Sequence, residues 1–274
     1  MKALQYIAVP AFEDNYIWLV TDGVDCLVVD PGDGAVVLGF CARHGLHLRA
    51  ILLTHHHLDH VGGIEALAVR LPAGSSIPIY GPAKECIANV SQRLSNGDTI
   101  RIEHPTFEAT VLDVPGHTLG HIAYYQAPAK DEPAHLFCGD TLFASGCGRI
   151  FEGTAAQLLA SLDLLAGLPS STRVHCAHEY TLSNALFAAV CEPGNVRALR
   201  WLDEVKALRA SGSSTLPTTI GHEKAVNPFL RCDEPSIQAT LSTRFGTPVA
   251  DRLAAFTLMR MWKDRFQQIS ESGR

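Results

Sequence analysis

The chain has 274 residues, of which 47% are hydrophobic and 18% are charged, and its formal net charge at pH 7 is −6. This length and composition predict a folded protein of about two domains and argue against extended disorder. A net acidic chain has no general attraction for nucleic acid or an anionic membrane, and no apolar run approaches the ~18 residues of a membrane span. Because no signal-peptide pattern precedes the first acidic residues, we expect a cytoplasmic protein.

Strand patterns dominate the first 180 residues, where short apolar runs alternate with turn residues. In chain order the expected elements are strands at 4–9, 16–21 and 26–29, a helix at 35–44, a strand at 48–54, a helix at 62–71, strands at 77–80, 107–114, 121–126 and 135–139, a helix at 154–166 and a strand at 173–177. Residues 83–98 mix helix and turn signals. Thr154 is a favourable N-cap for the helix that follows it.

The pattern becomes helical after residue 180. Apolar residues recur at helical spacing over 195–210 and 249–269, and a polar loop is expected at 211–219. We therefore predict two domains, residues 1–179 and residues 180–274.

Residues 54–60 read Thr-His-His-His-Leu-Asp-His and directly follow an apolar run that predicts a buried strand. In an extended turn, side chains two apart point the same way, so His55 and His57 can converge on one metal ion. Asp59 and His60 lie about one turn further on and can reach a second ion. The segment therefore predicts half of a two-metal site.

Three further ligand-type residues, His117, Asp140 and His178, each come just after an expected strand. If those strands share one sheet system, their ends bring the three side chains to the histidine-rich turn. The predicted ligands of one ion are His55, His57 and His117, and those of the other are Asp59, His60 and His178, with Asp140 bridging. Taken singly, each residue also fits a structural role, such as a turn cap or a buried, hydrogen-bonded histidine.

The donor set contains only imidazole and carboxylate groups, which suits zinc, iron or manganese in a catalytic site. Of the other histidines, we expect His56 and His121 to hydrogen-bond around the site. The eight cysteines show no C-x-x-C spacing, and several lie in apolar runs. We expect them to be buried free thiols that bind no metal.

The strings T-H-H-H-x-D-H, G-H-T-x-G-H, G-D-T-L-F and H-E-Y-T resemble the motifs of the metallo-β-lactamase superfamily. The whole chain, including residues 147–149 and 227–231 and the pair Arg260 and Lys263, resembles the glyoxalase II family, the hydroxyacylglutathione hydrolases. This resemblance implies an α/β fold, an αββα sandwich of two mixed β-sheets, followed by an α-helical domain over the metal edge. It also implies two divalent metal ions per chain, held by the seven residues named above.

The resemblance further implies a glutathione site formed by Arg149, Tyr180, Arg260 and Lys263. Glutathione carries two carboxylates, so a net acidic protein needs a local cationic clamp to hold it. A helix over 249–269 would place Arg260 and Lys263 on one face and apolar residues on the opposite face, although such a pair alone is more typical of a solvated surface. Phe151 stands where some relatives have a tyrosine, so one hydrogen bond to the substrate is expected to be missing.

The implied activity is hydrolysis of S-(2-hydroxyacyl)glutathione, chiefly S-D-lactoylglutathione, to glutathione and D-lactate, the second step of methylglyoxal detoxification. A hydroxide shared by the two metal ions would attack the thioester, with Asp59 and Asp140 tuning it. We expect zinc, with iron or manganese as alternatives, and a monomer. The main alternative function is a glutathione persulfide dioxygenase with a single iron; a lactonase or nuclease and a non-catalytic metal-binding protein are further alternatives.

Overall fold

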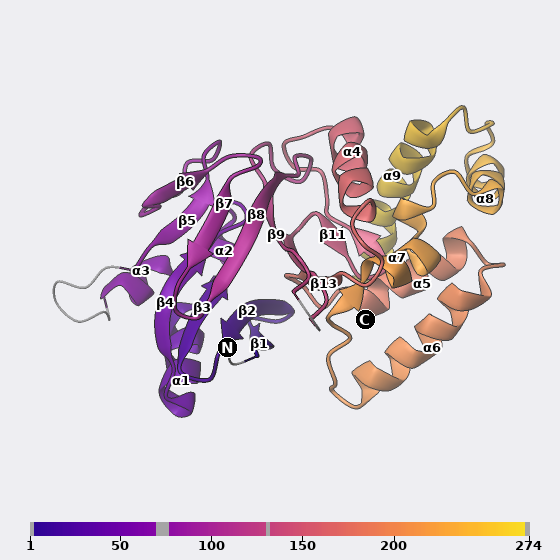
Figure 1. Cartoon of the computed structure of the whole chain (residues 1–274). Helices are drawn as coiled ribbons and strands as arrows, with labels where there is room; N and C mark the ends of the chain where they lie inside the picture. Colours follow the sequence, from indigo (N-terminus) through magenta and orange to yellow (C-terminus); the bar gives the residue numbers. More distant parts are fainter. Residues whose placement is uncertain (1–2, 70–76, 130–131, 272–274) are drawn as a thin grey trace.

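The computed structural model describes residues 3–69, 77–129 and 132–271, and in them two six-stranded sheets pack face to face (Figure 1). The spatial order of the first sheet is β1 (Gln5–Ala11), β2 (Asn15–Thr21), β3 (Asp25–Val29), β4 (His47–Leu52), β5 (Ile79–Pro82) and β6 (Gln92–Leu94). Strands β1 to β3 pair antiparallel, whereas β3 to β6 pair parallel.

The order of the second sheet is β14 (Thr218–Thr219), β13 (Arg173–Cys176), β10 (His135–Gly139), β9 (Ile122–Gln126), β8 (Phe107–Asp113) and β7 (Thr99–Ile102). Only β10 and β13 pair parallel among these neighbours. A small hairpin of β11 (Leu142–Phe143) and β12 (Gly146–Cys147) lies beside the sheet. Both large sheets are therefore mixed, which confirms the predicted sandwich.

The burial pattern of β2 explains the order of the layers. All seven of its residues are buried, so both faces of the first sheet are covered. Trp18 faces the core between the two sheets, together with Phe137 of the second sheet. Leu19 points the opposite way and packs with Val37 of α1, because successive side chains of a strand alternate between faces.

The helices within the described residues are α1 (Gly34–His44), α2 (Leu58–Val61), α3 (Ile64–Val69), α4 (Ala155–Ala166), α5 (Thr181–Cys191), α6 (Val196–Ala210), α7 (Ile220–Val226), α8 (Pro235–Phe245) and α9 (Arg252–Glu271), with a 3-10 turn η1 (Pro228–Leu230). Figure 1 shows α5 to α9, coloured orange to yellow, gathered beyond the second sheet. There α9 contacts α4, α5 and α8. Within the described ranges, no helix is both long and apolar enough to cross a membrane.

Several expected elements differ in detail from the observed ones. The helix expected at 62–71 begins later, as α3 at Ile64, because a separate short helix, α2, ends at Val61 and a turn follows it; residues 70 and 71 lie outside the described residues. The break occurs where the chain passes very close to another segment: a Cβ on Gly63 would lie 2.3 Å from the backbone N of Gly34. At Thr154, the predicted N-cap is confirmed, because its side chain accepts a hydrogen bond from Gln157 N in a full capping box.

Candidate metal centre and adjoining pocket

Strand ends position the predicted metal ligands at one edge of the sandwich. The first sheet contributes the turn after β4, which leads into α2 with His57 as the N-cap. Asp140 directly follows β10, and Gly139 before it has a φ of 47°. A Cβ on Gly139 would lie 2.4 Å from Thr54 Oγ1, so only glycine lets β10 approach the histidine-rich turn this closely. All seven predicted residues come together: His55, His57, Asp59, His60, His117, Asp140 and His178.

Three imidazoles form the first group of candidate ligands. Nε2 of His55 lies 3.0 Å from Nδ1 of His57, and the same Nδ1 lies 3.1 Å from Nε2 of His117. Ring nitrogens at these separations lie close enough for all three to bind one ion.

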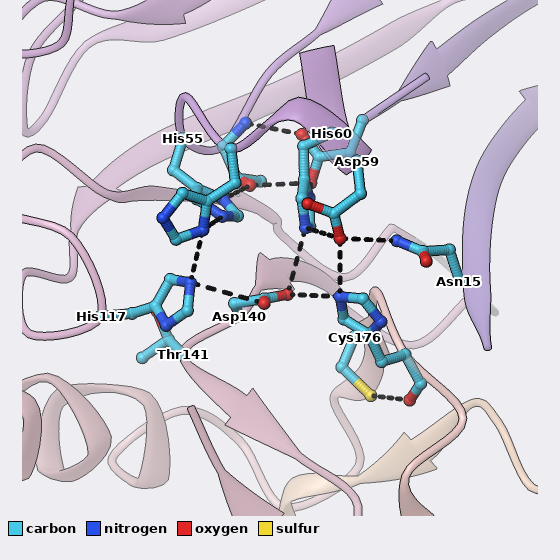
Figure 2. A network of polar contacts seen from close by, with 12 residues as sticks. Asn15, His55, Asp59, His60, His117, Asp140, Thr141 and Cys176 are labelled. Atoms are coloured by element: carbon cyan, nitrogen blue, oxygen red, sulfur yellow. Dashed lines mark hydrogen bonds and ion pairs between the residues drawn. The ribbon is translucent and has the colours of Figure 1, made fainter. Parts of the chain in front are cut away.

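The second group consists of Asp59, His60 and His178. Asp59 Oδ2 lies 3.5 Å from Nε2 of His60 and 3.4 Å from Nε2 of His178. Asp140 lies between the two groups, as Figure 2 shows. Its Oδ1 is 3.5 Å from His60 Nε2 and 3.3 Å from His178 Nε2, whereas its Oδ2 is 3.5 Å from His117 Nε2. The carboxylate therefore presents one oxygen to each group.

The chemistry of these atoms fits a divalent cation. Within the described residues, His60 Nε2 and Asp140 Oδ1 are buried without a hydrogen-bond partner. Buried polar atoms without partners are costly and rare in folded proteins. An ion that binds both atoms removes that cost, so the residues present fit a metal centre.

Neighbouring carboxylates and carbonyls orient the ligands. Nδ1 of His117 donates to the backbone O of Arg149 at 2.8 Å. Nδ1 of His178 lies 2.8 Å from Oδ1 of Asp14. In each ring, Nε2 therefore points toward the candidate ligand groups. A hydrogen bond at Nδ1 of this kind fixes the tautomer of metal-binding histidines.

Asp30 holds the histidine-rich turn in place, and sequence reasoning missed it. Its carboxylate accepts hydrogen bonds from Thr54 N at 2.8 Å and Thr54 Oγ1 at 2.7 Å, and it lies 3.0 Å from Nδ1 of His60. Asp30 follows β3 with a φ of 52°, a backbone conformation that aspartate adopts more readily than most residues. The Asp-Pro-Gly string after the strand was the available signal.

His56 and His121 lie beside the candidate ligands, as predicted. Nδ1 of His56 is 2.9 Å from a carboxylate oxygen of buried Glu85, which also accepts a hydrogen bond from the Thr118 hydroxyl. Nε2 of His121 accepts a hydrogen bond from Asp140 N at 3.1 Å. Glu85 therefore joins the turn that carries His55 and His57 to the loop that carries His117.

The electrostatics of the centre favour added positive charge. Burial holds the pKa of His55 well below its usual range, so this ring is a neutral donor. Burial also opposes the charged form of His178, but Asp140 and Asp14 outweigh it and raise the pKa to about 9. Asp140 is buried, which opposes its charged form, yet His178 and His60 hold the pKa of its carboxyl far below the usual range. A carboxylate that stays ionised inside the protein calls for a cation beside it.

A cavity of about 270 Å³ adjoins Asp140 and is lined by all four predicted substrate-binding residues, Arg149, Tyr180, Arg260 and Lys263. Arg260 and Lys263 are only 4% and 2% exposed. Arg260 Nη1 donates to the backbone O of Cys147 at 2.9 Å, and Lys263 Nζ donates to Oγ of Ser183 at 2.9 Å.

The position of this basic pair corrects one expectation. We expected Arg260 and Lys263 on a face of the last helix opposite its apolar side chains. In α9 they lie on the buried side, adjacent to Met259 and Trp262, because α9 packs over the cavity instead of exposing a charged face. Burial and the nearby Arg260 charge lower the pKa of Lys263 to about 7.

Tyr180 and Phe151 are two of the aromatic residues that border the cavity. The ring of Tyr180 stacks on His178 with centroids 4.7 Å apart. Phe151 is 62% exposed, and its ring centroid lies 5.3 Å from that of His57 and 5.2 Å from that of His117.

Comparison with known proteins identifies the class of this fold and site. Residues 11–178 match the family model for the metallo-beta-lactamase superfamily, and residues 179–266 match the model for the hydroxyacylglutathione hydrolase C-terminus. Among solved structures, the BLEG-1 B3 metallo-beta-lactamase is 26% identical with a TM-score of 0.60, covering 83% of this chain and 99% of that one. ETHE1 from Myxococcus xanthus is 23% identical with a TM-score of 0.62, covering 94% and 89%, and supports the fold alone. The chain is thus a member of the metallo-β-lactamase superfamily.

Curated relatives narrow the class. The hydroxyacylglutathione hydrolase of Cupriavidus taiwanensis is 55% identical over 262 residues, covering 94% of this chain and 98% of the relative. That of Shewanella halifaxensis is 48% identical over 267 residues, covering 96% and 100%. The chain belongs to the hydroxyacylglutathione hydrolase family, glyoxalase II. The predicted enzyme class and its place in methylglyoxal detoxification are confirmed.

Proposed function

We propose that this chain hydrolyses S-D-lactoylglutathione to glutathione and D-lactate with two divalent cations, zinc being the metal we expect. The observation that carries the proposal is the position of Asp140, which presents one oxygen to each ligand group and also borders the cavity lined by Arg260 and Lys263. The proposed ligands are His55, His57 and His117 for one ion and Asp59, His60 and His178 for the other, with Asp140 shared.

Bound divalent cations supply Lewis acidity, which lowers the pKa of water and polarises a thioester carbonyl. The donor set is compatible with zinc, and also with iron or manganese, because none of its members is a thiolate. Asp59 and Asp140 are the catalytic residues of the proposal. Both have a pKa held below the usual range, so each stays ionised and can accept a hydrogen bond from the attacking water.

The cavity supplies the binding energy for the glutathione part. Its buried cations Arg260 and Lys263, with Arg149, match the carboxylates of the tripeptide in charge. Tyr180 places a hydroxyl at the same cavity and is fixed by stacking on His178. Holding the remote tripeptide positions the thioester carbonyl beside Asp140, where binding energy is used for orientation. Glutathione thiolate is a good leaving group, so the reaction needs no strong protein acid.

The remaining parts of the proposal concern organisation. Residues 1–179 would form the metal-binding domain and residues 180–274 the substrate-binding domain, although Arg149 reaches the cavity from the first. We further propose a cytoplasmic monomer.

A substrate comparison tests the function. Metal-replete protein is given S-D-lactoylglutathione, and loss of the thioester absorbance is followed; a second sample receives glutathione persulfide, and oxygen uptake is followed. The proposal predicts rapid thioester loss without oxygen uptake. Oxygen uptake without thioester loss would instead establish the persulfide dioxygenase.

A further inference from the structure

Two buried thiols touch on the side of the first sheet that is covered by α1. Cys26 lies on β3 and Cys41 on α1, and their Sγ atoms are 3.7 Å apart. Both are free cysteines. A disulfide bond is about 2.05 Å long, so the two sulfur atoms would need to approach by only about 1.7 Å. Both belong to the apolar cluster between the sheet and α1, away from the metal centre.

The contact makes the two thiols chemically unequal. The hydrogen bond between them lowers the pKa of Cys41, against the effect of burial, and together with burial it raises the pKa of Cys26. Cys41 is also 8% exposed, whereas Cys26 is fully buried. Because the thiolate is the reactive form of cysteine, we expect a small oxidant to react with Cys41 before it reacts with Cys26. Cys26 then lies directly behind it as a resolving thiol.

The segment between the two cysteines supports the metal centre. Strand β3 leads directly into Asp30, which accepts the Thr54 hydrogen bonds and lies 3.0 Å from His60 Nδ1. Two residues later, Gly32 lies against the backbone of Asp59, where an added Cβ would be 1.8 Å from the carbonyl oxygen. A bond between positions 26 and 41 would therefore fix both ends of the segment on which Asp59 and His60 rest.

We propose that Cys26 and Cys41 form a reversible, peroxide-driven disulfide that joins β3 to α1. In the first step, the Cys41 thiolate attacks one oxygen of hydrogen peroxide, the O–O bond breaks, and hydroxide leaves while Cys41 becomes a sulfenic acid. In the second step, the Cys26 sulfur attacks the Cys41 sulfur, the S–O bond breaks, and the departing oxygen leaves as water with the Cys26 proton. Overall, two thiols lose two hydrogen atoms and one peroxide becomes two waters. A dithiol reductant reverses the bond by thiol–disulfide exchange.

The test uses full-length, zinc-loaded protein carrying Cys86→Ser, which removes an exposed thiol. After treatment with hydrogen peroxide, the protein is denatured, alkylated and digested, and its peptides are weighed. We expect a linked Cys26–Cys41 peptide pair, two hydrogen atoms lighter than the reduced pair and released by dithiothreitol. The thermal midpoint of the oxidised protein should rise by about 5–10 °C, because a bond across 15 residues restricts the unfolded chain.

Two matched variants assign the steps. Cys41→Ser should leave Cys26 open to alkylation after peroxide treatment, and Cys26→Ser should leave a sulfenic acid at Cys41 that dimedone traps. The decisive sample is protein with both thiols present, so poor folding of a serine variant does not affect the conclusion. The proposal is overturned if Cys26 and Cys41 both remain alkylatable at a peroxide dose that oxidises Cys86 in the unsubstituted protein, or if Cys41 links to a different cysteine.

Discussion

Lys263→Met removes a buried charge from the substrate cavity while keeping most of the side-chain volume. The lysine is 2% exposed, and its Nζ donates to the backbone O and Oγ of Ser183 at 3.1 and 2.9 Å. Burial and Arg260 lower its pKa from 10.5 to about 7. This shift means that the protein destabilises the charged form of Lys263 by roughly 4–5 kcal/mol relative to water. An apolar replacement removes that destabilisation, so we expect the thermal midpoint to stay the same or to rise.

The same substitution should weaken substrate binding. A charge-assisted hydrogen bond to a glutathione carboxylate contributes about 2–3 kcal/mol, so the KM for S-D-lactoylglutathione should rise roughly 30- to 150-fold, with little change in kcat. Steady-state kinetics and a thermal melt on one preparation separate this loss from misfolding. Lys206→Met, on the exposed surface of α6, is the control and should change neither quantity.

The pH profile gives a second readout for Lys263. Only the protonated amine of Lys263 attracts a substrate carboxylate. The pH dependence of kcat/KM reports the pKa of such a group in the free enzyme. In the unsubstituted protein, kcat/KM should therefore fall as the pH rises above about 7. The Lys263→Met variant should lack this alkaline decline. An unchanged KM, or the same decline in both proteins, would refute a role for Lys263 in holding the substrate.

Three further outcomes are expected. Asp140→Ala removes the carboxylate shared by both ligand groups, so elemental analysis should show lost metal and the hydrolysis assay almost no turnover; near-normal turnover would contradict the shared role. Phe151→Tyr should lower KM without changing kcat if the missing hydroxyl contact matters, and an unchanged KM would mean that it does not. Burial and Arg173 lower the pKa of His135, which lies 2.8 Å from His175, to about 4. Between about pH 6.5 and pH 4, this histidine therefore binds a proton more readily in the unfolded chain than in the folded protein. The free energy of unfolding decreases as the pH is lowered through that range. His135→Phe should make the drop in thermal midpoint between pH 7 and pH 5 smaller, whereas an equal drop would exclude this histidine.

The candidate ligands could be predicted from the sequence because short-range patterns determine where most of them lie. His55, His57, Asp59 and His60 are close in sequence, and alternation in a turn is enough to divide them between two ions. The remaining ligands could be placed because each follows a strand, and strand ends meet at sheet edges. The pairing of β8, β9, β10 and β13 in one sheet and the approach of the two sheets then had to hold, and both do.

The supporting residues could not be found in this way. Asp30 acts on His60 because β3 and β4 are parallel neighbours in the first sheet, a pairing that the order of residues does not reveal. Asp14 reaches His178 only because the β1–β2 turn lies beside the end of β13. The burial of Lys263 likewise depends on how α9 packs against α4 and α5. The family resemblance named Arg260 and Lys263, but helical periodicity alone did not reveal that they lie on the buried side of α9.

The most direct test of the central claim is the initial rate of S-D-lactoylglutathione hydrolysis as zinc is added back to chelator-treated protein, with the bound metal counted in the same samples. The account predicts that turnover is abolished by the chelator and returns in full only when two equivalents are bound, with a KM below about a millimolar. Full activity at one equivalent, or turnover that persists after all metal has been removed, would contradict a centre built from two ligand groups around Asp140.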